Sequence, residues 1–154
     1  MIEARCTLTQ PLGTRRQFVV TTGSNHHFLI DDPQGATGAK PIELVAAALA
    51  GCTAFDVINI LRKKRQQVTG YEVRVEADQV TTPPQVFTDV RIHHIVTGCG
   101  VQHSAVEDAI RLSEEKYCSV GAMLGRAARI HADFEIQEES SEVCSRHAET
   151  VSVP

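Results

Sequence analysis

The clearest hydrophobic pattern in the chain is a strict alternation that occurs twice. Residues 71–80 alternate between apolar and charged side chains, and residues 86–98 repeat the alternation after a Thr-Thr-Pro-Pro turn. A period of two is typical of half-buried antiparallel strands, so the two segments predict a long hairpin. Its apolar face is expected to hold Tyr71, Val73, Val75 and Ala77 from the first strand, and Val90, Ile92, His94 and Val96 from the second.

The other elements follow from turn signals and apolar stretches. Turn-forming residues separate three short strands before the hairpin, and a loop that ends in Pro41 precedes a long helix. After the hairpin, the pattern predicts two helices and a last strand. The predicted bounds are residues 3–9, 16–21 and 26–30 for the first strands, 41–67 for the long helix, 103–116 for the second helix, a short helix after Cys118, and 129–137 for the last strand.

The order of elements, β-β-β-α-β-β-α-α-β with mostly antiparallel strands, indicates the α+β class. No repeat and no internal linker divides the chain, so residues 1–137 are predicted to form one domain. Residues 138–154 are polar with little periodicity, and we expect them to form a flexible C-terminal tail.

The long helix is apolar around nearly its whole circumference over residues 41–61. Its length is close to the ~20 residues of a membrane span, but Glu43, Asp56 and Asn59 lie within it and a basic run follows. We therefore expect a buried central helix and no membrane span. The strands of one protomer cannot cover such a helix on all sides, which predicts a homodimer with the central helices packed together.

Composition narrows the functional classes. The chain of 154 residues has a formal net charge of −4, which argues against a general nucleic-acid-binding protein. Its N-terminus has no apolar run after a basic start, so no signal peptide is expected. The five cysteines (Cys6, Cys52, Cys99, Cys118 and Cys144) are odd in number and irregularly spaced, which favours free thiols over a disulfide framework. These features predict a soluble cytoplasmic protein.

Cys52 and Cys118 are the candidates for chemistry. Cys52 lies in the apolar helix, where a free cysteine often only fills space. Cys118 lies where one predicted helix ends and another begins, and the N–H groups at a helix N-terminus lower the pKa of a thiol. Cys52 would need a cation from elsewhere, and the pattern alone leaves both readings of it open. The candidate cations are Arg15, Arg16, Arg126 and Arg129.

The sequence predicts no metal site and no cofactor. Cys99 and His103 form a C-x-x-x-H pair, and Cys144 and His147 form a C-x-x-H pair. Two isolated pairs fall short of the four ligands of a structural zinc site. Cys6 is expected to serve packing.

Two cysteine segments together resemble those of a known family. The stretch PIELVAAALAGCTAFDV, residues 41–57, resembles the central helix of the OsmC/Ohr superfamily of osmotically inducible and organic-hydroperoxide-resistance proteins. The stretch EKYCSVGAML, residues 115–124, resembles its second cysteine segment, and FTDVRIHHIVTG between them resembles its YhfA-like branch. The resemblance extends over residues 1–137.

This resemblance implies a fold and an activity. The fold is OsmC-like, with antiparallel sheets around a long buried central helix, in an intertwined homodimer with active sites at the interface. The activity is thiol-dependent reduction of organic hydroperoxides. Cys52 would attack the peroxide, Cys118 would resolve the sulfenic acid to a disulfide, and a dithiol would reduce that disulfide. A mostly apolar pocket would favour alkyl or lipid hydroperoxides.

The chain departs from the peroxidases at the groups that activate the first thiol. Those enzymes place a carboxylate ten residues before the first cysteine and use it with an arginine. Here that position is Ile42, while Glu43 comes nine residues before Cys52. At about 100° per residue, Glu43 lies roughly opposite Cys52 and is better suited to the helix N-terminus. No arginine occupies the matching place in the sequence.

Asp56 is another carboxylate near Cys52, one helical turn later on the same face. An unpaired anion there would raise the pKa of the thiol. One hypothesis is that an arginine, from this chain or its partner, bridges Asp56 and Cys52. The other is that Asp56 is bonded elsewhere in the interface.

Two functions therefore remain open at this point. The first is an organic hydroperoxide reductase, favoured by the retained cysteine pair. The second is a non-catalytic OsmC-like dimer that binds a small hydrophobic ligand or acts as a redox sensor, favoured by the missing carboxylate and arginine.

Overall fold

The computed structural model describes residues 1–9, 16–32 and 37–151, the last five of these by their backbone alone. Backbone contacts divide the chain into two compact units, Met1–Val45 and Ala46–Pro154. The long helix α1 (Pro41–Lys63) begins in the first unit and continues in the second.

The first unit contains a three-stranded antiparallel meander. Its strands are β1 (Ala4–Leu8), β2 (Phe18–Thr22) and β3 (His27–Ile30), in the order β1-β2-β3. These bounds confirm the three short strands predicted from the turn signals. Asn25 takes the left-handed conformation in the tight turn between β2 and β3, with φ of 61°, a conformation that asparagine tolerates well.

The second unit is built on a sheet with the strand order β4-β5-β6. The predicted hairpin is confirmed as β4 (Gln67–Gln79) and β5 (Phe87–Cys99), which pair antiparallel. The last strand, β6 (Arg129–Glu138), pairs parallel to β5, so this sheet is mixed. The expectation of antiparallel sheets is therefore wrong at this edge, because the chain from β5 returns through helices before it adds β6.

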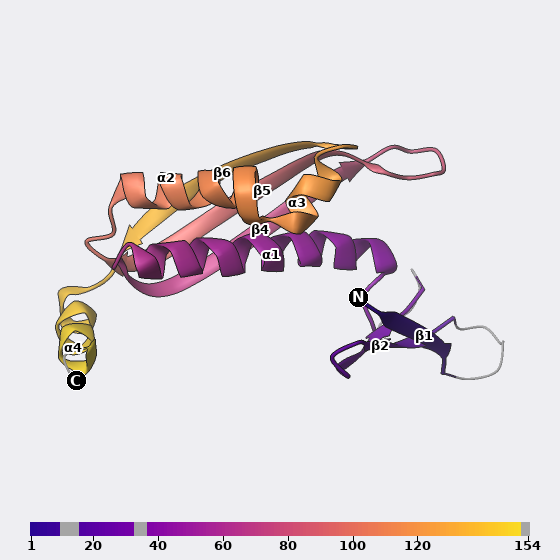
Figure 1. Ribbon diagram of the computed structural model, residues 1–154, viewed down its shortest axis with the longest axis horizontal. Helices are drawn as coiled ribbons and strands as arrows, with labels where there is room; N and C mark the ends of the chain where they lie inside the picture. The colour runs from indigo at the N-terminus through magenta and orange to yellow at the C-terminus, as the bar shows by residue number, and fades with distance from the viewer. Residues whose placement is uncertain (10–15, 33–36, 152–154) are drawn as a thin grey trace. The chain divides into compact units, whose positions relative to one another are not determined.

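Helices α1 and α2 (His103–Leu112) lie against one face of this sheet (Figure 1). The core joins both helices to the central strand β5. α1 ends at Lys63, before the predicted end at residue 67, because Arg65 takes a left-handed φ of 58° and turns the chain into β4. The fully packed core residues are Val57, Leu61, Val96, Val101, Ala105, Val106, Ala109 and Ile110.

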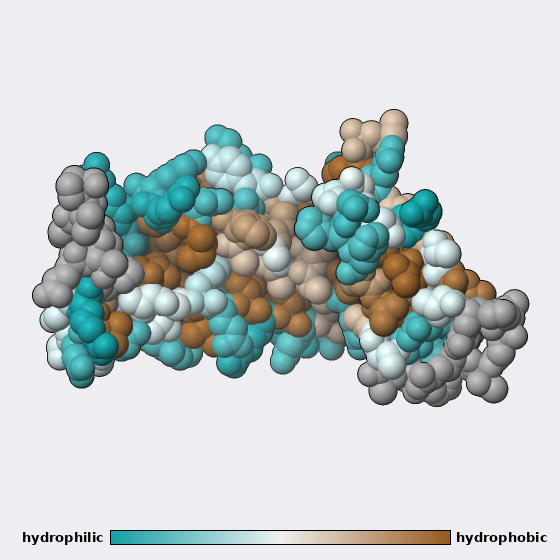
Figure 2. All heavy atoms as spheres, turned by 90° about the horizontal axis from the view of Figure 1, so that it is seen from below, coloured by the Kyte–Doolittle hydropathy of each residue, from teal (hydrophilic) through white to brown (hydrophobic). Residues whose placement is uncertain are grey.

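Among the residues that the structure describes, the buried side chains of α1 form one stripe, although the sequence predicts a buried helix. Its buried residues recur at intervals of four: Leu49, Thr53, Val57 and Leu61. Phe55, between them in sequence, is 76% exposed. Apolar surface is visible along the side of the molecule on which α1 lies (Figure 2). By length and composition α1 could also cross a membrane.

The C-terminal segment forms a helix, α4 (Ser141–Val151), where the sequence predicts a flexible tail over residues 138–154. A disulfide between Cys99 and Cys144 ties this helix to the end of β5, with Cα atoms 5.7 Å apart. The expectation of free thiols rather than disulfides is therefore wrong for this pair, whereas Cys6, Cys52 and Cys118 are free. The two bonded cysteines are 45 residues apart and no motif links them, so only the fold brings them together. Cys6, expected to serve packing, is an exposed free thiol.

His94, on β5, is completely buried on the helix-covered face of the sheet. Its Nδ1 shares a 2.6 Å hydrogen bond with the hydroxyl of Tyr71, while Nε2 has no hydrogen-bond partner among the described residues. The ring is therefore placed in the core, on the apolar face that the alternation predicts, with one of its two nitrogens hydrogen-bonded. Burial lowers the pKa of His94 to about 4, so the ring is neutral at physiological pH.

We predict that protonation of His94 destabilises the fold in acid. The unfolded chain takes up this proton near the ordinary histidine pKa of about 6.5, whereas the folded chain resists it down to a pKa of about 4. The free energy of unfolding should therefore fall by about 3 kcal/mol as the pH drops through this window. Urea unfolding between pH 7.5 and pH 4, followed by circular dichroism, measures the slope.

The matched variants are His94→Leu, which should lose this part of the pH dependence, and His131→Gln, which removes an exposed histidine of β6. An equal slope in wild type and His94→Leu would contradict the assignment.

Candidate functional site

Three side chains with thiol or carboxylate groups meet between α1 and the segment that follows α2. Cys52 and Asp56 lie one turn apart on α1, and Cys118 directly precedes the short helix α3 (Ser119–Leu124). One ligand-type atom from each residue lies within 4.8 Å of the corresponding atoms of the other two. Cys118 is buried, whereas Cys52 and Asp56 are partly buried. The two cysteines that the resemblance pairs are thus neighbours in the fold.

A widened helical turn places Cys118 at this position. After α2 the chain makes one π-helical turn, η1 (Ser113–Tyr117), closed by a 2.8 Å hydrogen bond from the N–H of Cys118 to the carbonyl of Ser113. The backbone of Cys118 is then extended, and its Sγ accepts a 3.2 Å hydrogen bond from the N–H of Gly121. A Cβ at residue 121 would lie 3.3 Å from this sulfur, so glycine at this position avoids a close contact with the thiol.

The predicted position of Cys118 at a helix N-terminus is confirmed, but the expected lowering of its pKa is wrong. Burial raises the pKa of the Cys118 thiol to about 11, and the neighbouring Cys52 and Asp56 raise it further. The hydrogen bond from Gly121 acts in the opposite direction but is outweighed. Desolvation disfavours the thiolate more than one N–H of a six-residue helix favours it. Cys118 is therefore protonated at neutral pH.

Two hydroxyl groups support the carboxylate of Asp56. Ser113 donates its hydroxyl to Asp56 Oδ2 at 3.1 Å, and Thr53 lies 3.2 Å from the same serine oxygen. Since the single Ser113 proton is used on Asp56, the Thr53 hydroxyl is the donor to Ser113. Ser113 and Thr53 are both buried, so the chain Thr53–Ser113–Asp56 is a built feature of the interior. Sequence reasoning missed both hydroxyls because serine and threonine carry no spacing signal.

The arginine expected to bridge Asp56 and Cys52 is not seen within the described part of the chain, where a serine contacts Asp56 instead. Arg129 forms a two-pronged pair with Asp89, with its shorter contact at 2.7 Å, and Arg16 lies 3.6 Å from Asp32. Arg126 is exposed. Arg15 lies outside the described residues. An arginine from a partner chain stays a hypothesis.

Glu43, the other predicted supporting carboxylate, caps the start of α1. Its Oε2 accepts a 2.9 Å hydrogen bond from the backbone N–H of Lys40, the residue before Pro41. A glutamate three residues into a helix that bonds back in this way forms half of a capping box. The side chain is thereby held at the helix N-terminus, as expected from its angular position.

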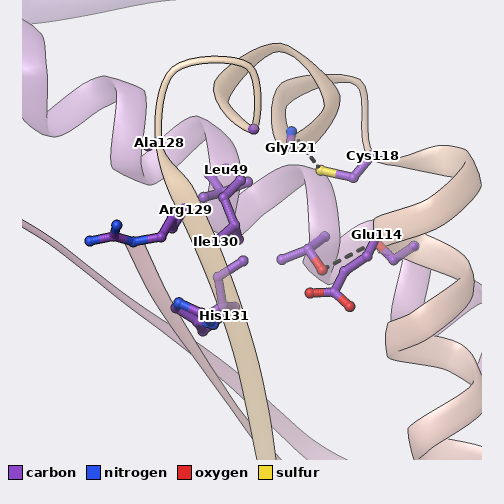
Figure 3. A pocket seen from close by; sticks show the side chains of 12 residues that line it. Leu49, Glu114, Cys118, Gly121, Ala128, Arg129, Ile130 and His131 are labelled. Atoms are coloured by element: carbon purple, nitrogen blue, oxygen red, sulfur yellow. Dashed lines mark hydrogen bonds between the residues drawn. The ribbon is translucent and has the colours of Figure 1, made fainter. Parts of the chain in front are cut away.

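A cavity of 540 Å³ opens beside this cluster. Figure 3 shows Cys118 at one end of it, with its sulfur turned to Gly121, and Glu114 at the side of η1. Burial raises the pKa of Glu114, with a contribution from Glu115, so this carboxyl takes up protons more readily than an exposed one. The lining is Leu49, Thr53, Ile92, Ser113, Glu114, Cys118, Gly121, Gly125, Ala128, Arg129, Ile130 and His131.

Comparisons with known proteins agree on one family. A family profile described as OsmC-like protein matches residues 33–133. The protein YhfA of Escherichia coli K12 is 40% identical over 119 residues, which cover 77% of this chain and 89% of YhfA. Its name states no function.

Solved structures show the same fold. A hypothetical protein from Aquifex aeolicus matches with a TM-score of 0.80 at 26% identity, covering 91% of this chain and 98% of that one. An organic hydroperoxide resistance protein from Legionella pneumophila matches with a TM-score of 0.64 at 17% identity, covering 88% and 96%. At that identity the likeness concerns the fold alone. In a fold of this family α1 is a core helix.

We predict that the anion at Asp56 contributes to the high pKa of Cys118. Asp56→Asn removes this charge, so the pKa of Cys118 should fall from about 11. The rate of alkylation at Cys118, followed against pH by peptide mass spectrometry, measures the midpoint. Glu115→Gln, which removes an exposed carboxylate of η1, should leave the midpoint in place. An unchanged midpoint in Asp56→Asn would exclude an electrostatic role of Asp56.

Proposed function

Because the chain belongs to the OsmC-like protein family, we propose that it reduces organic hydroperoxides by thiol chemistry. Cys52 is the attacking thiol and Cys118 the resolving one. The observation that carries the proposal is the proximity of the two sulfurs, which lie within 4.8 Å of each other. A disulfide needs a sulfur–sulfur distance of about 2.05 Å, so closure asks for a movement of less than about 3 Å.

Burial supports the assignment of roles to the two cysteines. The nucleophile towards a peroxide is a thiolate, and the raised pKa of Cys118 keeps that residue protonated in the resting protein. Cys52 is partly exposed on α1, where a peroxide can reach it. Cys118, held by the Gly121 N–H, then stands within reach as the second thiol.

The proposed reaction consists of peroxide reduction, disulfide formation and reduction of the disulfide by a dithiol. The Cys52 thiolate attacks the terminal oxygen of the hydroperoxide, the O–O bond breaks, and the alcohol leaves with a proton from solvent. The Cys118 thiol then attacks the Cys52 sulfenic acid, forming an S–S bond and releasing water. A dithiol reduces this bond by two exchange steps and is itself oxidised to a disulfide. Asp56 is near enough to Cys118 to accept its proton during the second step.

The cavity supports an organic substrate. Leu49, Ile92, Ala128 and Ile130 form an apolar part of its wall, which supports a substrate with an alkyl or lipid chain. The exposed apolar residues of α1 and its surroundings support a homodimer that covers them; Phe55 is 76% and Met123 65% exposed. We place the protein in the cytoplasm, where dithiol reductants are available.

A second candidate function is a redox sensor or a carrier of a small hydrophobic ligand. One observation favours it: the cavity wall presents the protonated Cys118, while Asp56 is bonded to Ser113 and not to an activating arginine of the described chain. In this case the pair would oxidise slowly, without turnover, and the cavity would hold an unreactive ligand.

We predict that one equivalent of cumene hydroperoxide removes two hydrogens from the reduced protein and forms a Cys52–Cys118 bond. Intact mass and peptide mapping after quenching with an alkylating agent measure both. Cys118→Ser should instead stop at a Cys52 sulfenic acid, trapped with dimedone, and Cys52→Ser should give neither product.

Cys6→Ser is the matched control, since Cys6 is an exposed free thiol in the other unit, and it should react like the wild type. Repeated turnover with a dithiol would indicate an enzyme, and oxidation without turnover would indicate a sensor. Slow oxidation scattered over several cysteines would contradict both functions.

A further inference from the structure

We propose that the reduced protein binds a thiophilic divalent cation, with Zn²⁺ as the best fit, through Cys52, Asp56 and Cys118. The three side chains come from two segments about sixty residues apart, and the fold brings their ligand atoms within 4.8 Å of one another. No spacing motif in the sequence predicts such a site, since its members are neither a C-x-x-C pair nor a histidine motif.

The geometry is close to what zinc requires. Zn–S bonds of about 2.3 Å and Zn–O bonds of about 2.0–2.2 Å in a tetrahedron place neighbouring ligand atoms about 3.5–3.8 Å apart. The observed separations are at most 4.8 Å, so a small inward movement of the side chains completes the triangle. Cys52 and Asp56 lie on one face of α1, one turn apart, which is a spacing at which two ligands can share an ion.

The donor set matches a borderline-soft cation. Two thiolates select zinc over magnesium or calcium, and a carboxylate is a common additional zinc ligand. Three protein ligands leave a fourth position for water or a bound molecule, and the cavity beside Cys118 provides the space for it.

The surroundings contain the second layer of contacts that metal ligands typically have. A ligating carboxylate is usually oriented by a hydrogen bond to its other oxygen or its free lone pairs. Here the Ser113 hydroxyl donates to Asp56 at 3.1 Å, and the buried Thr53 lies within hydrogen-bonding distance of that serine. A cation at this point also compensates the negative charge that two thiolates and a carboxylate would otherwise hold in a partly buried place.

Metal binding and disulfide formation exclude each other at this site, since a Cys52–Cys118 bond consumes two of the three ligands. This consequence rests on the proposed function, whereas the binding of the cation does not. Zinc would protect the reduced pair from oxidation, and removal of zinc would leave it open to a peroxide.

Titration of the reduced, metal-free protein with Co²⁺ tests the site, with Zn²⁺ as competitor. We expect one equivalent per chain, a thiolate-to-cobalt charge-transfer band, and displacement of cobalt by zinc. Cys52→Ser and Cys118→Ser should each lose the band, and Asp56→Asn should weaken binding by at least tenfold. Cys6→Ser is the matched control and should bind like the wild type.

The double variant Cys99→Ser/Cys144→Ser keeps the site and removes the other cysteine pair, so it should retain the band. The wild-type protein, oxidised to the Cys52–Cys118 disulfide, should bind no cobalt, which tests the ligands without a substitution. Absence of the band in the reduced wild type, or its persistence in Cys52→Ser and Cys118→Ser, would overturn the proposal.

A peroxide assay on the metal-free protein separates this proposal from the proposed function. If the protein binds cobalt but does not turn over peroxide, the proposed peroxidase function is wrong and the metal site stands. If it turns over peroxide but does not bind cobalt, the metal site is wrong and the proposed function stands.

Discussion

The packing of α1 against the sheet is the constraint on which the site depends. Leu49, Thr53, Val57 and Leu61 recur every four residues and form the buried stripe of the helix. Cys52 and Asp56 each precede a member of this stripe by one residue, about 100° around the helix. Cys52 and Asp56 therefore lie at the edge of the packed surface and are partly buried. The packing of the buried stripe fixes the rotation of α1 and so the direction in which these two side chains point.

The second half of the site is set by a departure from regular helix geometry. One π-helical turn after α2 carries Ser113 into the interior and brings Cys118 to the start of α3. Ser113 accepts from Thr53 and donates to Asp56, so it connects the two halves through hydroxyl groups rather than through charge. The buried Cys118 thiol, beside the Asp56 carboxylate, is therefore held protonated. In the proposed reaction it acts only after Cys52 has reacted.

The sequence predicts the hairpin, α1 and the short N-terminal strands well, because each has a clear period or clear turn residues. Period alone does not tell whether β6 runs parallel or antiparallel to β5, since that depends on where the intervening helices return the chain. Nor does it reveal α4, whose residues 141–146 are exposed or only partly buried, or the Cys99–Cys144 bond, whose partners meet only in the folded chain. At the site, the resemblance identifies Cys52 and Cys118, while Thr53 and Ser113 become visible only when the interior is built. The high pKa of Cys118 was missed for a related reason: burial outweighs the helix N-terminus, and burial is a property of the fold.

The disulfide between Cys99 and Cys144 changes how much oxidation one chain can absorb. Each pair of cysteines gives up two electrons when it forms a disulfide. A chain in which both pairs are reduced can therefore give up four electrons before any cysteine is oxidised irreversibly. The two pairs are separate: the disulfide ties α4 to the end of β5, whereas Cys52 on α1 and Cys118 just before α3 are free thiols. Cys6, the fifth cysteine, belongs to neither pair and is an exposed free thiol of the first unit.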